Sequence, residues 1–349
     1  MLPAGHGDAL WIEYGEGEAV HRVLIDCGTR ETARVLARRI ETLPAHERFF
    51  ELFVMSHIDS DHIGGALPLL KTIRRGVRFG DVWFNGWRHL PGQLGAWQAE
   101  IFSSAIEGLE LPWNSRFNGK AVVVGDDNLP EVTLPGGLRL TLLSPTLTQL
   151  KKLAPAWSRE LKRYGFEPGG KADYSQFLKG TRSQSTDVDQ LAETPFAGDA
   201  GLPNGSSIAL LAEFHDSRIL LGADAHAPVL AESIRKLLKQ RNAGKQLMLS
   251  AFKVSHHASQ NNLNSELVKL LKCPHYLIST NGKHFCHPDH EAIARIIKHG
   301  GPNCALHFNY KTTFNSVWEQ ADLQRRYAYS AHYPAENEEG TSVPLTGVG

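Results

Sequence analysis

The chain has 349 residues, of which 42% are hydrophobic and 21% are charged, values that are ordinary for a soluble globular protein. Its 37 Lys and Arg residues balance 37 Asp and Glu residues, so no global charge draws it to nucleic acid or to an anionic membrane. A nucleic-acid substrate would therefore have to be held by a local basic patch. No run reaches the roughly 18 apolar residues of a membrane span and no secretory signal is recognisable, so we expect a cytoplasmic protein without membrane contact.

The domain organisation expected from the sequence is simple. A chain of this length buries a full core, and we expect a single domain over residues 1–330. Residues 165–203 are polar and rich in helix-breaking residues, which predicts a surface insertion or lid. Residues 331–349 are predicted to be a flexible tail. The four cysteines form no CxxC pair, which fits a reducing compartment, and we assign no disulfide.

The predicted elements alternate between short apolar strands and amphipathic helices. The expected strands, in chain order, span residues 9–14, 20–26, 52–55, 79–84, 121–124, 138–143, 207–214, 219–221, 251–254 and 276–279. The expected helices span residues 31–41, 65–73, 97–106, 148–164, 229–240, 264–271 and 288–298. A hairpin followed by strand–helix alternation occurs twice, which predicts an α/β fold in which two sheets pack as a sandwich covered by helices.

The stretch SHIDSDHIGGA, residues 56–66, follows a short apolar strand and is rich in metal-ligand side chains. The imidazoles of His57 and His62 and the carboxylates of Asp59 and Asp61 can converge on one point at the end of a strand, which favours a metal site. The two glycines that follow would let the backbone turn tightly beside it. The alternative is a polar loop whose aspartates cap the next helix and whose histidines bond to backbone groups.

Three later clusters also follow apolar strands. Asp224 lies in LLGADAH, His256 and His257 lie in KVSHHAS, and further histidines lie in TNGKHFCHPDH. Taken alone, Asp224 is more typical of a helix cap or a turn. Together, Asp and His residues at four strand ends favour one shared site, because ligands of open α/β architectures bind at the carboxyl ends of the strands.

A joint resemblance to the metallo-β-lactamase superfamily is carried by seven stretches taken in order: GHGDALWIEYG, VLIDCG, SHIDSDHIGG, NGSSIALL, LLGADA, KVSHHAS and NGKHFCHP. The set is most similar to the hydrolase domain attached to the DNA-uptake channel protein ComEC and to its soluble relatives, over residues 5 to about 300. The resemblance implies a four-layer αββα sandwich of the metallo-β-lactamase type and a metal-dependent hydrolase. The membrane channel of that family has no counterpart in this chain, so transport is not implied.

The resemblance also implies a ligand set for two metal ions. His57 and Asp59 would bind the first ion, Asp61 and His62 would bind the second, and Asp224 would bridge both. Two such cations lower the pKa of a bridging water, polarise a phosphoryl oxygen and stabilise the leaving oxygen. Asp61 could also orient that water or accept its proton.

Further roles are implied around this ligand set. One of His256 and His257 would complete the second site, and the sequence leaves open which of them does so. Asp26 would orient a ligand by hydrogen bonding to it from outside the ligand set. His287 is the candidate for protonating the leaving group or contacting phosphate, with a structural role before Pro288 as the alternative.

Three residues are candidates for holding the substrate. Lys253 and Ser259, from KVSHHAS, could help to hold a phosphate group, although a lysine in a strand is usually solvated. His284 is a weaker candidate than the neighbouring His287 for contact with the reacting group. All of them rest on their positions in stretches that resemble the family motifs.

Two departures from the usual superfamily pattern bear on the metal. Asp59 stands where most members have His, although the ComEC-like branch shares the Asp, and the usual third-motif histidine is missing near residues 204–207. The first site therefore has harder and fewer protein ligands, which favours Mn²⁺ or Mg²⁺, with Zn²⁺ as the alternative. What replaces the missing histidine cannot be read from the sequence.

The leading functional hypothesis is a metal-dependent phosphodiesterase, most specifically a nuclease that acts on DNA. A second hypothesis is hydrolysis of a small phosphoester such as a cyclic nucleotide or a phosphocholine ester, because the superfamily uses one centre for many substrates. A third is a metal-binding subunit of a multi-protein complex with a degenerate site, which only the missing histidine supports. The expected partner is nucleic acid or another phosphodiester, and protein partners belong to the third hypothesis.

Overall fold

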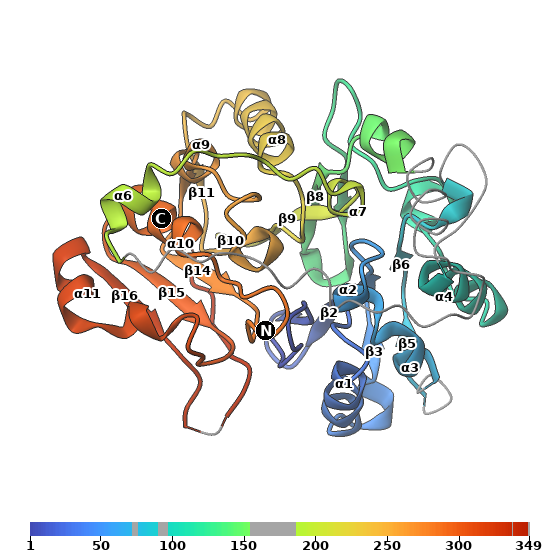
Figure 1. Cartoon of the computed structure of the whole chain (residues 1–349). Helices are drawn as coiled ribbons and strands as arrows, with labels where there is room; N and C mark the ends of the chain where they lie inside the picture. The colour runs from blue at the N-terminus through green and yellow to red at the C-terminus, as the bar shows by residue number, and fades with distance from the viewer. Residues whose placement is uncertain (72–75, 90–96, 154–185, 337, 348–349) are drawn as a thin grey trace.

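The computed structural model describes the chain except for residues 72–75, 90–96, 154–185, 337 and 348–349 (Figure 1). The described strands are β1 (Leu10–Tyr14), β2 (His21–Ile25), β3 (Phe49–Phe50), β4 (Leu52–Val54), β5 (Arg78–Phe79), β6 (Val82–Trp83), β7 (Glu131–Thr133), β8 (Arg139–Ser144), β9 (Ala209–Phe214), β10 (Ser217–Leu221), β11 (Leu247–Met248), β12 (Ala251–Lys253), β13 (Leu271–Lys272), β14 (His275–Ile278), β15 (Cys304–Phe308) and β16 (Tyr329–His332). The described helices are α1 (Thr32–Glu41), α2 (Ser60–Ile63), α3 (Ala66–Leu70), α4 (Trp97–Gly108), α6 (Val188–Ala192), α7 (Leu202–Gly205), α8 (Ala227–Gln240), α9 (Ser265–Lys269), α10 (His290–His299) and α11 (Ala321–Tyr327).

The smaller main sheet has the strand order β1-β2-β4-β6. The predicted hairpin is confirmed, because β1 and β2 pair in antiparallel register from Leu10 opposite Ile25. β4 and β6 then add in parallel, and Ile25 pairs with Val54. Parallel strands end at the same edge of a sheet, so Asp26 and Ser56, which follow β2 and β4, lie side by side.

The larger sheet has the order β16-β15-β14-β12-β10-β9-β8-β7. Its middle strands β10, β12 and β14 run parallel, with Leu221 opposite Lys253 and Lys253 opposite Leu277. The segments that follow these three strands therefore leave the sheet at one edge. Those segments contain Asp224 and the paired histidines His256 and His257.

The two sheets pack face to face and helices cover both outer surfaces (Figure 1). Val23 and Val54 of the smaller sheet share one core with Leu140 and Leu220 of the larger sheet. The other face of the smaller sheet packs against α1, α3 and α4 through a second core that includes Phe53. Helices α8, α9 and α10 contribute their buried faces to the first core. The predicted α/β fold with four αββα layers is confirmed.

Several predicted elements differ in detail. The strand predicted over 121–124 is a single bridge at Val124. The helix predicted over 65–73 corresponds to α3, which spans Ala66–Leu70, and residues 72–73 of that prediction lie outside the described residues. The short helix α2 before it was not predicted. Strands β15 and β16 and helix α11 extend the fold beyond the last predicted helix. The two strands pair in parallel with partners far away in the sequence, and such pairing leaves no local pattern from which the strands could be predicted.

The predicted insertion and tail are only partly comparable with the structure. Residues 165–185 of the predicted insertion lie outside the described residues, and the remainder includes α6 and α7. The boundary predicted at residue 330 cuts through β16, so it is wrong. Beyond it, Thr341 and Met1 exchange two backbone hydrogen bonds, and Ser250 Oγ donates to Thr346 O at 2.8 Å. Composition alone misses such backbone anchoring.

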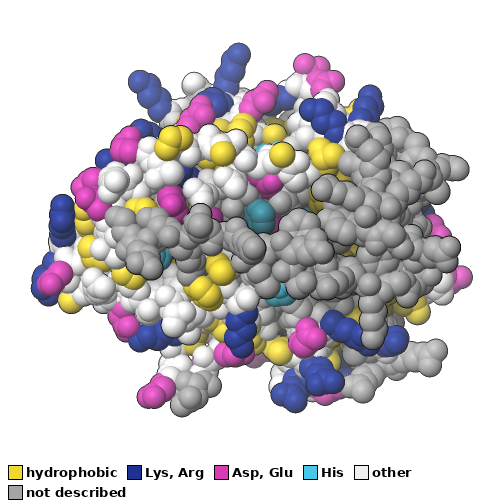
Figure 2. All heavy atoms as spheres, in the orientation of Figure 1, with side chains coloured by type: hydrophobic (Ala, Val, Ile, Leu, Met, Phe, Trp, Pro, Cys, Tyr) yellow, Lys and Arg dark blue, Asp and Glu magenta, His cyan; other side chains and the backbone are white. Residues whose placement is uncertain are grey.

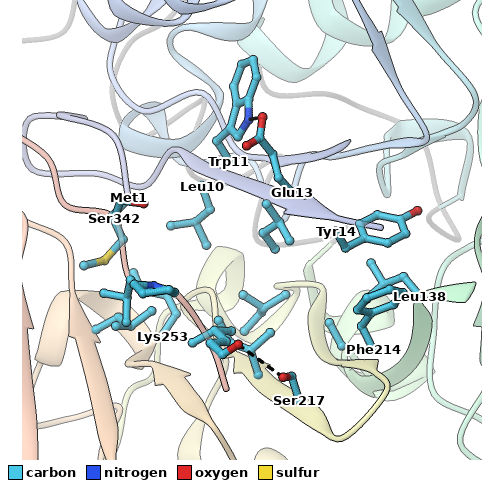
Figure 3. A pocket seen from close by; sticks show the side chains of 18 of the residues that line it. Met1, Leu10, Trp11, Glu13, Tyr14, Leu138, Phe214, Ser217, Lys253 and Ser342 are labelled. Carbon is cyan, nitrogen blue, oxygen red and sulfur yellow. Dashed lines mark hydrogen bonds between the residues drawn. The ribbon is translucent and has the colours of Figure 1, made fainter. Parts of the chain in front are cut away.

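A cavity of about 440 Å³ lies between the two sheets, beside the segment 341–345 (Figure 3). Its lining includes Leu10 and Tyr14 of the smaller sheet and Phe214 of the larger sheet. Lys253 also lines it, but no candidate metal ligand does. This cavity is therefore separate from the strand ends that carry the Asp and His residues. No described helix combines the length and apolar character needed to cross a bilayer.

Candidate metal centre

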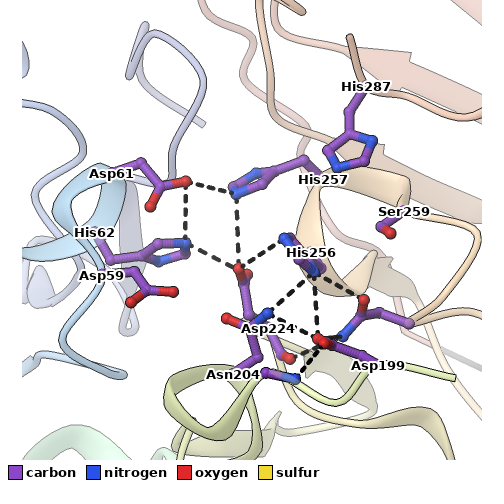
Figure 4. A network of polar contacts seen from close by, with 12 residues as sticks. Asp59, Asp61, His62, Asp199, Asn204, Asp224, His256, His257, Ser259 and His287 are labelled. Carbon is purple, nitrogen blue, oxygen red and sulfur yellow. Dashed lines mark hydrogen bonds and ion pairs between the residues drawn. The ribbon is translucent and has the colours of Figure 1, made fainter. Parts of the chain in front are cut away.

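The predicted ligands from three strand ends, those of β4, β10 and β12, come together around Asp224 (Figure 4). Asp224 Oδ1 lies 3.3 Å from His62 Nε2, and Asp224 Oδ2 lies 3.8 Å from His57 Nε2. The same Oδ2 lies 3.6 Å from His256 Nε2 and 3.9 Å from His257 Nε2. Asp224 thus occupies the centre of the cluster.

Asp61 and Asp59 lie on two sides of this centre. Asp61 Oδ2 is 3.4 Å from His257 Nε2 and 4.0 Å from His62 Nε2. Asp59 Oδ2 is 3.6 Å from His57 Nε2, and the Asp59 side chain is 40% exposed. Asp59 precedes α2, but its side chain makes no capping hydrogen bond. The capping alternative is therefore wrong for Asp59, which leaves its carboxylate available on the solvent side of the cluster.

Among the described residues, three groups of ligand atoms meet the spacing that a metal ion requires; one is Asp8, Asp26 and His62, and the other two are triads at the Asp224 cluster that share His62. In each triad the atoms lie within 4.8 Å of one another, and the triads are His57, His62 and Asp224, and Asp61, His62 and His257. The set combines imidazole nitrogen and carboxylate oxygen, which suits first-row divalent cations. The donor chemistry therefore fits a metal centre.

The hydrogen bonds of His57 and His62 determine which ring nitrogen faces the centre. His62 Nδ1 lies 2.7 Å from Asp26 Oδ2, and Ser56 Oγ donates to the same oxygen at 2.7 Å. Because its proton is committed to Asp26, Ser56 Oγ accepts from His57 Nδ1 at 3.0 Å. Both rings thus carry the proton on Nδ1, and both present Nε2 to Asp224.

The paired histidines are oriented in the same way. His257 Nδ1 donates to Ser279 O at 2.7 Å, because a carbonyl oxygen can only accept. The amide nitrogen of Asn262 donates to Asp199. This turns the Asn262 Oδ1 atom towards His256 Nδ1, which lies 2.7 Å away. Nε2 of each ring again faces Asp224. The sequence left open which histidine takes part, and the structure directs both at the centre.

Consecutive residues can point the same way here because the backbone turns left-handed after β12. His256 and His257 have φ of 47° and 53°, and Ala258 follows with φ of 63°. Non-glycine residues adopt this region at a cost of roughly 1 kcal/mol or more each, so the surrounding packing must impose it. Such strain is typical of functional sites.

Within the described part of the chain, three of the four ring nitrogens facing the centre are buried without a hydrogen-bond partner. The buried atoms without a partner include His57 Nε2, His62 Nε2, His257 Nε2 and Asp224 Oδ1. Buried polar atoms are normally satisfied, and an unpartnered one costs about 1–3 kcal/mol. Several such atoms directed at one point are explained if a cation binds between them.

The negative charge of the buried carboxylates also indicates that a cation binds here. Within the described residues, the carboxylates of Asp61 and Asp224 have only histidines as ion-pair partners. Burial lowers the pKa of His256, but Asp224 and Asp199 raise it more, to about 10. Without a metal, protons on the histidines must balance the buried carboxylates. A cation would take over that role and release those protons.

The structure places Asp26 where the resemblance implies, outside the ligand set and bonded to a ligand. Its carboxylate is buried and also accepts a hydrogen bond from Ser56 N at 2.7 Å. Asp26 itself has φ of 58°, at the end of β2. It therefore fixes His62 through Nδ1 and holds the start of the SHIDSDH loop at the same time.

Replacing Asp26 with asparagine should weaken metal binding by about 10–100-fold, because outer partners of metal-bound histidines contribute that much. The amide would lose one of the oxygens that hold His62 and Ser56. Calorimetric titration of metal-free protein with Mn²⁺ measures the effect. The control is Asp127→Asn, since Asp127 is exposed. Equal Mn²⁺ affinity in Asp26→Asn and in the wild-type protein would contradict this role.

The glycines after the loop serve packing rather than a tight turn. Gly64 and Gly65 have helical backbone angles, with φ of −57° and −81°. A Cβ on Gly65 would lie 2.2 Å from Cys27 O, and one on Gly64 would lie 2.3 Å from Ser60 O. The predicted reason for these glycines is therefore wrong. They allow the segment after β2 to approach the loop closely.

The predicted substrate residue Lys253 does not face the centre. Its side chain is fully buried, and Nζ donates to Asp8 Oδ2 at 2.7 Å and to Val254 O at 3.0 Å. Asp8 Oδ1 lies 3.4 Å from His257 Nδ1. Lys253 neutralises Asp8, so its assignment as a phosphate-binding side chain is wrong.

The other predicted residues lie around the centre. His287 Nδ1 is 3.1 Å from Asp289 Oδ1, and its ring lies edge-on to His256 with 5.5 Å between the centroids (Figure 4). Ser259 is buried beside it, and its Oγ accepts from Asn261 N. His284 stacks on His6, 4.8 Å between centroids. The contacts of these three residues place them on a rim around the ligand set.

Four residues near the centre were not singled out from the sequence. His6 and Asp8 come from the quoted stretch GHGDA, to which no role was given, and Asp199 and Asn262 support His256. Asp199 also accepts from Asn204 at 2.7 Å. Asn204 occupies the segment of the missing third-motif histidine, and its Oδ1 is buried without a partner among the described residues. Only the GHGDA stretch offered a sequence signal.

The chain was compared with family models, curated proteins and solved structures, and only solved structures are similar to it. No family model and no curated protein matches the chain. The metallo-beta-lactamase fold protein YhfI from Bacillus subtilis is 11% identical over 97% of this chain and 95% of that chain, with a TM-score of 0.41. The short form of human tRNase Z is 10% identical over 99% of this chain and 96% of that chain, with a TM-score of 0.42. A protein from Parabacteroides distasonis described as a metal-dependent hydrolase is 10% identical over 95% of this chain and 90% of that chain, with a TM-score of 0.38.

Proposed function

We propose that the chain is a metal-dependent phosphodiesterase whose substrate is DNA. The observation that carries the proposal is the common orientation of the four histidines. Each has Nδ1 engaged by a neighbour and Nε2 directed at the Asp224 carboxylate. A degenerate structural site would not need this many oriented and unpartnered ring nitrogens. We therefore place the third hypothesis, a metal-binding subunit without activity, behind the enzyme.

The ligand assignment follows from the distances. Asp61, His62 and His257 would hold one cation, and His57 and Asp59 would hold a second one. Asp224 would serve both, and His256 lies beside the same carboxylate. Bound cations would lower the pKa of a water molecule and polarise the phosphoryl group. Carboxylates form a large share of this set, which favours Mn²⁺ or Mg²⁺, with Zn²⁺ as the alternative.

The protein's own side chains supply the acid–base chemistry. Burial raises the pKa of Asp61, but His62 and His257 lower it more, so Asp61 is a carboxylate that can accept a proton from the attacking water. On the rim, His287 is fixed through Nδ1 by Asp289. Because Nδ1 donates to Asp289, a proton for the leaving oxygen would come from Nε2 of the imidazolium form of His287; burial lowers the pKa of this ring, and Asp289 opposes that shift. Asp61 and His287 are the proposed catalytic residues.

The activity can be tested with metal-stripped protein. We expect Mn²⁺ or Mg²⁺ to restore cleavage of single- or double-stranded DNA and of the generic diester bis(p-nitrophenyl) phosphate, and chelation to remove it again. Cleavage products are measured by gel electrophoresis and by nitrophenolate absorbance. Hydrolysis of cyclic nucleotides or phosphocholine esters without DNA cleavage would support the small-phosphoester alternative. No hydrolysis with Mn²⁺, Mg²⁺ or Zn²⁺ would contradict the proposed function.

A further inference from the structure

A groove on the outer surface of α1 is lined by cationic side chains. It encloses about 580 Å³ between α1 and the end of α3, and Glu31 and Glu41 are its acidic members. Its cationic members are all exposed, and they are Arg30, Arg34, Arg38 and Lys71. In Figure 2, Lys and Arg side chains gather at the lower edge, where Figure 1 shows α1. The chain has no net charge, so this is a local concentration of positive charge.

Two of the three arginines follow the repeat of the helix. Arg34 and Arg38 are four residues apart on α1, and Arg30 lies in the turn just before the helix begins at Thr32. At about 1.5 Å per residue, the backbone positions of Arg34 and Arg38 are roughly 6 Å apart along one side of the helix. A nucleic-acid strand carries a charge about every 3.4 Å along a duplex axis. A row with this spacing can therefore contact alternate phosphates of one strand.

These cations are not committed to other groups in the protein. Among the described residues, no ion pair or side-chain hydrogen bond involves Arg30, Arg34, Arg38 or Lys71. Elsewhere the arginines are engaged, as Arg22 is with Glu13 and Glu47. Uncommitted guanidinium groups in a groove are the typical contacts of phosphate backbones.

The row begins beside the candidate metal centre. Cys27 N donates to His62 O at 2.9 Å, and Gly65 N donates to Gly28 O at 3.1 Å. A Cβ on Gly64 would lie 3.1 Å from Arg30 N. The segment that leads into α1 is thus packed on the backbone that carries the ligand His62.

We propose that this groove, lined by Arg30, Arg34, Arg38 and Lys71, binds the phosphate backbone of the nucleic-acid substrate. The inference rests on the proposed function. An anionic membrane is the other class of polyanion, but insertion into lipid needs exposed apolar side chains. The large exposed apolar residues among those described are Val20, Leu109, Leu147 and Phe285, and none lies on α1 or α3. The groove therefore matches a nucleic acid better than a membrane.

The test uses the full chain with Arg30→Gln, Arg34→Gln and Arg38→Gln combined. The probe is a labelled single-stranded phosphorothioate oligonucleotide, which resists hydrolysis, and binding is followed by fluorescence anisotropy between about 50 and 200 mM salt. Losing three phosphate contacts should reduce the slope of log affinity against log salt by about 2 and weaken binding at least about tenfold at 0.1 M salt. Replacing the same arginines with lysine should preserve the slope.

The matched control removes three positive charges elsewhere. Lys239, Lys245 and Lys272 are exposed, and a triple Gln variant there should keep the wild-type slope. Thermal unfolding confirms that each variant is folded. The proposal is overturned if the groove variant keeps the wild-type slope, if the control variant loses it equally, or if the wild-type protein binds phosphatidylserine vesicles but not the oligonucleotide. Failure to hydrolyse bis(p-nitrophenyl) phosphate would refute the proposed function instead, while the slopes would still decide the role of the groove.

Discussion

Replacing Asp61 with alanine should lower the rate of phosphodiester hydrolysis by about 10²–10⁴-fold, the range for losing a positioned acid–base group. Asp61 is both a ligand candidate beside His257 and His62 and the proposed proton acceptor. The fold should persist, because Asp61 contributes to it through its backbone oxygen, which accepts from Asp8 N at 3.3 Å. Steady-state kinetics with bis(p-nitrophenyl) phosphate and circular dichroism measure both parts of this expectation.

The matched control for that variant is Asp127→Ala. Asp127 is exposed, and its only described contact uses the backbone oxygen, which accepts from Gln240. Its variant should hydrolyse the diester at the wild-type rate. Full activity in Asp61→Ala would show that the catalytic assignment is wrong, and equal loss in both variants would show that the assay reports something other than the centre.

Replacing Lys253 with methionine should lower the free energy of unfolding by about 3–5 kcal/mol, the cost of breaking a buried ion pair from one side. The change would leave the Asp8 carboxylate buried without its ammonium partner, and both side chains are almost completely buried. Asp8 also lies beside His257, so the ring would lose part of its support. Chemical denaturation gives the free energy of unfolding directly.

Two comparisons make the Lys253 expectation specific. Lys239→Met, at an exposed position, should change the free energy of unfolding by no more than about 0.5 kcal/mol. Asp8→Leu combined with Lys253→Met should recover part of the loss, because no unpaired charge remains buried. If Lys253→Met instead keeps its stability and binds DNA more weakly, the lysine contacts substrate as the sequence alone suggested.

The Asp8–Lys253 pair also sets a direction for the dependence of stability on pH. Burial raises the pKa of Asp8, but Lys253 and His257 lower it more, so its folded-state pKa is below the ordinary value. The pair therefore contributes fully above the ordinary carboxylate range. This contribution is lost as the pH falls through the folded-state pKa.

The ligand cluster was predictable because its signals are local. His57, Asp59, Asp61 and His62 follow one strand within six residues, and the other clusters also stand directly after apolar strands. Parallel pairing brings the strand ends of each sheet to one edge, and the packing of the two sheets on each other brings Asp224 of the larger sheet to 3.3 Å from His62 of the smaller one. The layer order follows from the same alternation of strands and helices.

The remaining assignments depended on contacts between distant parts of the chain. Lys253 was assigned to substrate because its partner, Asp8, is 245 residues away. Asp199 supports His256 through Asn262, and no local pattern connects the three. The glycine at position 65 is explained by the carbonyl of Cys27, which follows another strand. Long-range contacts of this kind decide charge neutralisation and close packing, and neither leaves a periodic signal.

The most direct test of the metal centre is anomalous diffraction from crystals grown with Mn²⁺. We predict anomalous density on both sides of the Asp224 carboxylate, one position in contact with Asp61, His62 and His257 and the other in contact with His57 and Asp59. Crystals of Asp224→Ala should lose density at one or both positions. Absence of anomalous density at the cluster in the wild-type protein, with the histidines bonded only to the carboxylates, would contradict the metal centre and the phosphodiesterase proposed from it.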